Sequence, residues 1–221
     1  MKIMKKIAAA MAVAFATVPH LFAAVELDAS VYATPFNRID AEAHDALYEK
    51  IPVGISIGGN FYFGEIKPFS IGLNVALGYD NFFNVDYGEE YDIDHGFNGS
   101  IAVGPVFRFG AADSRHSFHI SPGVQFDFLG MKSELVDDTC DLFFALDFGV
   151  HIDAGYSLWL VQKEKFALAL NFGVDYSIGA GRVCNTWVNK KAEEFGDIEW
   201  YDLNSAQHLK VYAGVKFRIG E

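Results

Sequence analysis

Residues 69–79, with the sequence FSIGLNVALGY, decide the fold, because large apolar side chains alternate there with small or polar ones. One set begins Phe69, Ile71, Leu73 and Val75, and the set between them consists of Ser, Gly, Asn and Ala. Successive side chains of a β-strand point to opposite faces, so this stretch predicts a strand with one strongly apolar face. Its length is about that of a tilted strand that crosses a bilayer.

The same period of two recurs in seven further stretches, which are residues 25–32, 51–63, 97–109, 118–128, 144–158, 166–178 and 209–219. Long polar segments follow every odd-numbered strand, near residues 33–50, 80–96, 129–142 and 180–206. Tight turns follow the others, near residues 65–68, 110–116 and 159–165. Short turns at one rim and long loops at the other are typical of outer-membrane barrels. The sequence therefore predicts an all-β protein, an eight-stranded antiparallel up-and-down transmembrane β-barrel with extracellular loops and periplasmic termini.

The first 23 residues predict a signal peptide. Three lysines, at positions 2, 5 and 6, precede an apolar run over residues 7–18, and Leu21-Phe22-Ala23 forms a plausible cleavage site. The apolar run is too short to act as a membrane anchor. We therefore expect residues 1–23 to be removed and residues 24–221 to form one barrel domain.

The alternation alone does not say which face points outward, so a soluble ligand-binding barrel of lipocalin type is the rival fold. The polar set is mostly Gly, Ser, Ala and Asn, which suits the crowded interior of a small barrel better than a solvated surface. The opposite set is rich in Phe, Leu, Ile and Val, and aromatic residues such as Trp159 gather near strand ends. Lipid contact with two aromatic girdles explains this distribution.

Charge excludes one class of partner. The formal net charge is −12 and the pI about 4.9, whereas nucleic-acid binding relies on a basic surface. We also expect no cofactor. The clustered carboxylates of the second loop around Asp86, Glu89 and Asp92 could gather a hard cation such as calcium, but a solvated acidic loop is the simpler explanation, so we expect no metal.

The strand count, the asymmetry of the two rims and the last strand resemble the small outer-membrane barrels of the OmpA-domain, OmpX and OmpW class, with a similarity to the small barrels of spirochaetes. Val211, Ala213, Val215 and Phe217 resemble the C-terminal signal that the barrel assembly machinery recognises, although four residues follow the Phe here. The resemblance covers the whole mature chain. It implies a monomer surrounded by outer-membrane lipid.

An enzyme is not expected. His119 and Ser121 have a His-x-Ser spacing similar to that of lipid A deacylase barrels, but a serine nucleophile also needs an oriented base, and no acidic partner is clearly placed.

Ionisable residues on the inward set predict a network of charges that fills the lumen. Lys210, Lys216 and Arg218 lie on the last strand beside Glu26 and Asp28 of the first strand, which closes the barrel. Buried ions must pair, because an unpaired ion costs several kcal/mol. The full predicted set is Glu26, Asp28, Asp127, Asp147, His151, Asp153, Asp175, Lys210, Lys216 and Arg218. A proton or ion relay through Asp127, Asp147, His151 and Asp153 is the alternative interpretation.

Two prolines interrupt neighbouring strands on either side of the turn at residues 110–116. Pro105 and Pro122 each lack a ladder donor, so the wall can have a local gap in its hydrogen bonding here. By resemblance to OmpW-type barrels, such a gap implies sideways passage of small apolar molecules. Outward-facing prolines tolerated in the wall are the simpler explanation.

The loop rim carries the remaining predictions. Cys140 and Cys184 lie at this rim over adjacent strands, so in an oxidising compartment we predict a disulfide between them. Aromatic residues often anchor interfaces, and the fourth loop contains Trp187, Phe195, Trp200 and Tyr201. We therefore expect a porin-like but filled barrel whose surface-exposed loops bind an extracellular ligand or host molecule, or which has a structural role. The alternative is OmpW-like passage of small hydrophobic molecules.

Overall fold

The computed structural model describes residues 24–41, 44–45, 47–48, 51–86, 92–134, 140–163, 166–188, 191–192, 199–200 and 206–220. Eight long strands form the wall: β1 (Ala24–Ala41), β4 (Val53–Tyr62), β5 (Phe69–Asp86), β6 (Asp92–Phe109), β7 (His116–Glu134), β8 (Cys140–Lys163), β9 (Phe166–Val188) and β12 (Ala206–Gly220). Four two-residue strands extend it at the loop end: β2 (His44–Asp45), β3 (Leu47–Tyr48), β10 (Lys191–Ala192) and β11 (Glu199–Trp200). The predicted signal peptide lies outside the described residues.

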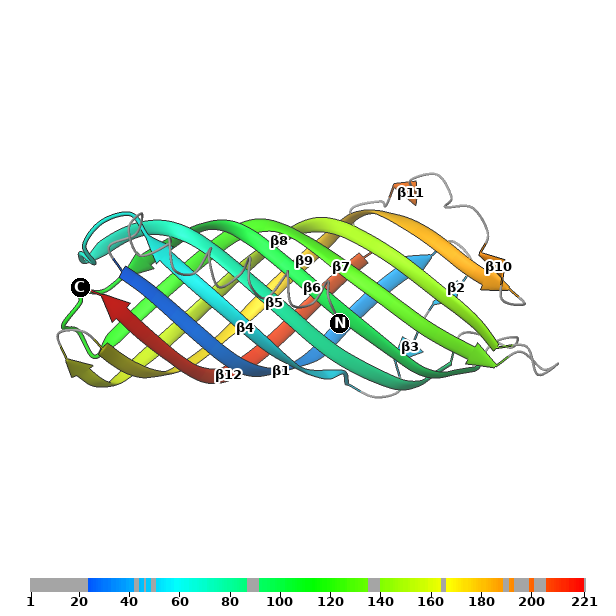
Figure 1. The fold of residues 1–221 in the computed structure, drawn as a ribbon, viewed down its shortest axis with the longest axis horizontal. Helices are drawn as coiled ribbons and strands as arrows, with labels where there is room; N and C mark the ends of the chain where they lie inside the picture. The colour runs from blue at the N-terminus through cyan, green and yellow to red at the C-terminus, as the bar shows by residue number, and fades with distance from the viewer. Residues whose placement is uncertain are drawn as a thin grey trace, which may run out of the picture.

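Each long strand pairs antiparallel with the next, and β12 pairs with β1, so the sheet closes on itself (Figure 1). At the closing seam Glu26 lies opposite Arg218, and Asp28 lies opposite Lys216. The predicted eight-stranded antiparallel barrel, closed by the pairing of its first and last strands, is thus confirmed. No helix among the described residues is long and apolar enough to span a bilayer.

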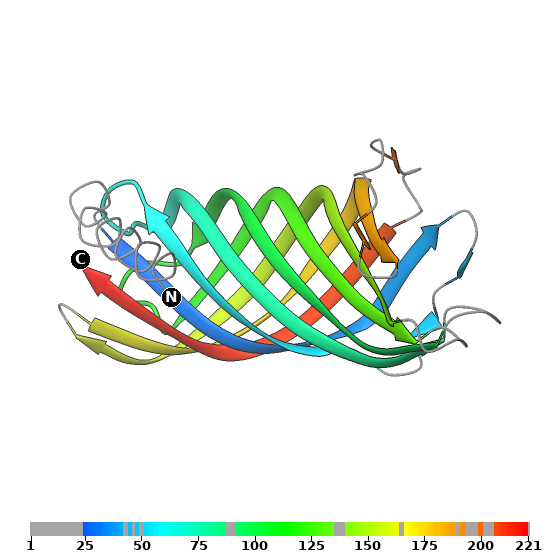
Figure 2. The ribbon, with the colours of Figure 1, turned by 45° about the vertical axis from the view of Figure 1, so that its right-hand side comes forward.

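The strands are longer than the alternation predicts. β1 continues to Ala41, β5 to Asp86 and β9 to Val188, and β8 begins at Cys140, so parts of all four predicted loops are strand. Figure 2 shows these long strands running on at the end of the barrel opposite the C-terminus. Backbone hydrogen bonding depends little on side-chain polarity, so the ladder continues where the apolar alternation stops.

The two faces of the wall divide as predicted. On β4 the outward Val53, Ile55 and Ile57 are 57–64% exposed, whereas the inward Asn60 is 1% exposed. Buried polar and charged residues come from all the long strands, and many large apolar side chains are exposed. A soluble lipocalin-type barrel needs the inverse arrangement, which the described strands do not have.

Trp159 corrects one prediction. We expected it in the outer aromatic girdle at the turn end, but its side chain lies in the interior and is 2% exposed. An irregularity in the pairing of β8 with β9 follows directly, between Trp159 and Val161. This shift lets Leu160 and Val161 both face outward, which a strict period of two does not allow.

Candidate functional site

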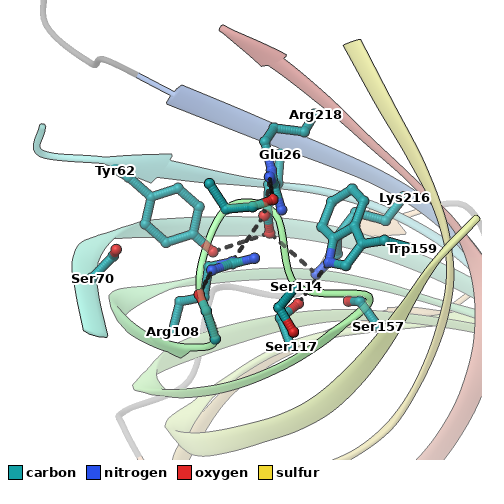
Figure 3. A network of polar contacts seen from close by, with 12 residues as sticks. Glu26, Tyr62, Ser70, Arg108, Ser114, Ser117, Ser157, Trp159, Lys216 and Arg218 are labelled. Carbon is teal, nitrogen blue, oxygen red and sulfur yellow. Dashed lines mark hydrogen bonds and ion pairs between the residues drawn. The ribbon is translucent and has the colours of Figure 1, made fainter. Parts of the chain in front are cut away.

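Glu26 is the centre of a buried cluster at the turn end of the lumen (Figure 3). Its Oε1 accepts hydrogen bonds from Arg108 Nε at 3.1 Å and Arg218 Nε at 3.2 Å. Lys216 Nζ lies 3.9 Å from Oε2, and the Tyr62 hydroxyl donates to Oε2 at 3.1 Å. All five residues are at least 95% buried, so one carboxylate is shared by three enclosed cations.

Further contacts close this end of the lumen. Arg108 Nη1 donates to the Gly110 carbonyl and Arg218 Nη1 to the Ala112 carbonyl, which ties the cluster to the turn at residues 110–115. The Arg218 guanidinium carbon lies 4.0 Å from the centroid of the Trp159 ring, a cation–π contact, and Trp159 Nε1 donates to Ser117 Oγ at 2.9 Å. Charged and aromatic side chains therefore occupy the turn end together.

The sequence predicted Glu26, Lys216 and Arg218 in this network but missed Arg108 and Tyr62. Both residues stand on the inward set of their strands, so alternation placed them in the lumen. It did not show that Arg108 reaches Glu26, because β6 does not neighbour β1. Tyr62 lies on β4, which pairs with β1, two residues from the Asn60 that is opposite Glu26, so its contact was missed although the pairing of these strands brings the two residues close.

The middle of the lumen contains a cavity of about 80 Å³, with Asp28, His119, Asp153, Asp175 and Lys210 among its lining residues. This volume exceeds the roughly 10–15 Å³ needed for one water molecule. The cavity and the buried polar side chains around it form the candidate functional site.

His119 and Asp153 make the first of two histidine–aspartate pairs. His119 Nε2 lies 2.8 Å from Asp153 Oδ2, and the Tyr212 hydroxyl donates to Asp153 Oδ1 at 2.8 Å. Two glycines make room for this arrangement, because a Cβ added to Gly155 or Gly173 would collide with the Tyr212 side chain.

His151 and Asp175 make the second pair, with Nδ1 of the histidine 2.7 Å from Oδ2 of the aspartate. Lys210 lies opposite Asp175 in the β12–β9 register, but its Nζ is 3.5 Å from Ser100 Oγ and 5.3 Å from the centroid of the Tyr32 ring. Asp175 Oδ1 and His151 Nε2 are both buried without a protein hydrogen-bond partner.

The remaining predicted carboxylates have separate partners. Asp127 accepts from Gln125 Nε2 at 2.7 and 2.8 Å, and Asp147 forms a two-pronged pair with Arg182, at 2.5 and 2.7 Å, nearer the loop end. Asp28 lies over Gly58 and lines the cavity. The four residues of the alternative relay therefore each meet a different partner, and the relay stays a prediction.

Asp80 is a buried lumen residue of β5, although the sequence places it in a loop. The Tyr32 hydroxyl donates to its Oδ2 at 2.7 Å. Sequence reasoning missed it because the apolar alternation of β5 ends at residue 79.

Pro105 and Pro122 face one another in the wall. The β6–β7 ladder pairs Val103 with Val124 and then Phe107 with Ile120. Between these two pairs, the described residues of β6 and β7 form no backbone pair. Ser121 Oγ donates to the Pro105 carbonyl at 2.9 Å and so replaces a missing backbone donor. The strands stay in contact, since a Cβ on Gly104 would collide with the Pro122 carbonyl.

The loop rim is described in part. Trp200 of β11 is 72% exposed, and its ring meets Phe148 edge-on at 5.6 Å between centroids. The backbone of Trp187 lies opposite Leu142, whereas Phe195 and Tyr201 lie outside the described residues.

The two cysteines lie at the loop ends of β8 and β9. In the backbone register Cys184 is opposite Ala145, five positions along β8 from Cys140. At roughly 3.3 Å per residue this is about 16 Å, whereas a disulfide needs Cα atoms within about 7 Å. A disulfide would require these strand ends to leave the register. The cysteine side chains lie outside the described residues, and the disulfide stays a prediction.

In the part of the chain that the structure describes, no three His, Cys, Asp or Glu side chains are grouped to hold a metal ion.

The similarity of this chain to known proteins is a similarity of fold. No protein-family model and no curated protein sequence matches the chain. Among solved structures, a major outer membrane protein from Thermus thermophilus has a TM-score of 0.53 at 11% identity, covering 88% of this chain and 99% of that one. The attachment invasion locus protein Ail of Yersinia pestis has a TM-score of 0.46 at 14% identity, covering 88% and 98%. Neisserial surface protein A has a TM-score of 0.42 at 12% identity, covering 90% and 96%. The chain thus has the fold of small outer-membrane β-barrels.

Proposed function

We propose that the protein is a non-conducting barrel of a cell outer membrane that presents its loops outside as a binding or adhesion surface. The observation that carries this proposal is the cluster around Glu26. Its charged side chains are at least 95% buried at the turn end, and Trp159 packs over Arg218 there. An eight-stranded barrel is narrow enough for side chains to fill it, so solute passage along the axis is disfavoured.

The membrane location follows from the outward face. Exposed apolar side chains cover the described strands, as on Ile55, Ile71, Val150 and Val211. In water such a continuous apolar band would drive aggregation, whereas lipid tails accommodate it. We infer a monomer surrounded by outer-membrane lipid, inserted by the barrel assembly machinery, with its termini in the periplasm.

Planar-bilayer recording tests the filled barrel. Reconstituted protein should give no steps in the nanosiemens range, whereas stable steps of that size would contradict the proposal. Shortening the fourth loop between β9 and β12 should abolish binding to cells or matrix components without changing the heat-modifiable electrophoretic migration of the folded barrel. Unchanged binding would show that the fourth loop is not the binding surface and would contradict this part of the proposal.

The prolines favour a second candidate function, passage of small apolar molecules through the wall. The supporting observation is the missing ladder between the Val103–Val124 and Phe107–Ile120 pairs. Changing Pro105 and Pro122 together to valine restores two backbone donors. Uptake of an apolar probe by vesicles should then fall if this part of the wall opens, and Val124→Ile, which alters no donor, serves as the control. Equal uptake by all three proteins would exclude passage here.

A further inference from the structure

The fourth loop returns to the barrel wall at β11, beyond the end of β12. The β12–β9 ladder reaches Gln207 and Ile178. Further along β9 the partner is β11, whose Trp200 pairs with Gly181. On the other side of Gly181, β8 pairs with it through Phe148. At the loop end of the barrel, β11 therefore continues the sheet in the place that β12 leaves (Figure 1).

This register places Trp200 on the outward face of the wall. Asp147 and Arg182 form an ion pair in the lumen. Phe148 and Gly181, the next residues on the same two strands, therefore face outward, and Trp200 shares the face of Gly181. Because Gly181 has no side chain, the rings of Phe148 and Trp200 meet across it, edge-on and 5.6 Å apart between centroids. One ring of the fourth loop thus lies on the apolar outer surface of the wall.

Phe148 marks the outer border of the apolar band. Tyr156, eight positions nearer the turn end of β8, contacts Phe118 in the aromatic girdle of that end. At roughly 3.3 Å per residue and a strand tilt of about 40°, eight positions rise about 20 Å along the barrel axis, close to the apolar band of about 25 Å. Phe126, opposite Phe148 on β7, is an outward aromatic residue near the same level. The ring of Trp200 therefore stands where acyl chains meet headgroups.

Trp200 has the chemistry of an interfacial anchor. Its side chain is 72% exposed, the highest fraction among the large apolar side chains of the described residues. An indole combines a large apolar surface with one N–H donor, and tryptophan is enriched where hydrocarbon meets headgroups. A soluble partner that bound this ring would have to enter the headgroup layer. Lipid is therefore the occupant that the position of the ring favours.

We propose that Trp200 docks the fourth loop onto the lipid surface, with its indole between the acyl chains and the headgroups of the outer leaflet. The docking holds this part of the loop against the side of the barrel, and it assigns lipid, in place of an extracellular ligand, as the contact of Trp200. The inference rests on the proposed membrane location with the loop end outside. It does not require that the loops bind a partner.

Quenching of tryptophan fluorescence in vesicles tests the docking. The folded full-length protein and its Trp200→Phe variant are reconstituted in phosphatidylcholine that carries bromine either near the headgroup or near the chain end. Lipid brominated near the headgroup should quench a larger fraction of the emission of the native protein than of the variant, with a smaller difference for lipid brominated near the chain end. Aqueous iodide should quench both proteins equally. Stronger iodide quenching of the native protein, or equal quenching of both proteins by each brominated lipid, would overturn the proposal.

Ile152→Trp separates the docking from the membrane location. Ile152 is 46% exposed on the outward face of β8, four positions from Phe148 towards the turn end. A tryptophan there should be quenched most strongly by lipid brominated near the chain end. Such quenching without quenching of Trp200 would overturn the docking alone. The absence of both would overturn the membrane location and the docking with it.

Trp187→Phe is the matched control for the loop end. The backbone of Trp187 lies six positions beyond Gly181 on β9, away from the turn end. This distance is about 15 Å along the barrel axis, so Trp187 should contribute to quenching by iodide and not to quenching by lipid. Equal loss of lipid quenching in Trp187→Phe and Trp200→Phe would show that the whole loop end lies in lipid, which would overturn a docking specific to Trp200.

Discussion

Replacing Glu26 by glutamine removes the negative charge that three buried cations share. The glutamine still offers an oxygen to Arg108 and Arg218, at the positions now 3.1 and 3.2 Å from Oε1, but the attraction that offsets their mutual repulsion is lost. Removing one partner of a buried ion pair costs about 3–5 kcal/mol. Three cations would be left without their shared carboxylate, so we expect the loss in the free energy of unfolding to lie in the upper part of this range.

Because three cations share one carboxylate, removing one cation should cost less stability than removing the carboxylate. Arg108→Gln leaves Glu26 with Arg218 and Lys216 and reduces the surplus positive charge, so it should cost less, below about 2 kcal/mol. Glu65→Gln, in the exposed turn after β4, is the control and should cost less than about 0.5 kcal/mol.

Urea unfolding of the barrel in lipid vesicles, followed by tryptophan fluorescence, measures these differences. With a slope of roughly 2 kcal/mol per molar urea, Glu26→Gln should lower the midpoint by about 2–2.5 M. A loss below about 1 kcal/mol, or an Arg108→Gln loss that equals or exceeds it, would show that Glu26 does not hold the turn end together.

Two further substitutions test packing in the lumen. Trp159→Ala removes the ring that contacts Arg218 and the hydrogen bond to Ser117, so it should lower the free energy of unfolding by about 3–5 kcal/mol. The same urea titration measures this loss, and the outward Leu160→Ala, which should cost less, is the control. Gly173→Ala places a methyl group against the Tyr212 side chain and the Ala154 carbonyl and should cost about 1–3 kcal/mol. A thermal midpoint equal to that of the native protein would show that the Tyr212–Asp153 bond and the strand beside it yield without cost.

The alternation of apolar and polar residues predicted which side chains of the barrel wall face outward, because all outward residues of a strand face the same apolar environment. The closing seam was also predictable: β1 and β12 must pair in a closed barrel, so Glu26 and Arg218 could be placed together from their strands. Contacts across the lumen were not predictable in this way. Arg108 reaches Glu26 from β6, which does not neighbour β1, and their meeting depends on stagger and twist that no pattern along one strand contains. Tyr62, on the neighbouring β4, was within reach of the prediction, since it lies two residues from the Asn60 opposite Glu26.

Two other differences have local causes. Asp80 was missed because β5 continues beyond the apolar band, where outward residues no longer need to be apolar. Trp159 was placed outside because large aromatic residues near strand ends usually form girdles. In the structure Trp159 continues the inward set that includes His151, its ring lies over the Arg218 guanidinium, and the irregularity before Val161 adds Val161 to the outward face beside Leu160.

The most direct test of the account measures which way each side chain of β5 faces. Single cysteines at residues 71–78, spin-labelled in lipid vesicles, report their exposure to oxygen dissolved in the lipid. Labels at positions 71, 73, 75 and 77 should be readily accessible, and those at positions 72, 74, 76 and 78 protected, with a period of two. Uniform accessibility, or the inverse alternation, would contradict a lipid-facing barrel with a filled polar lumen.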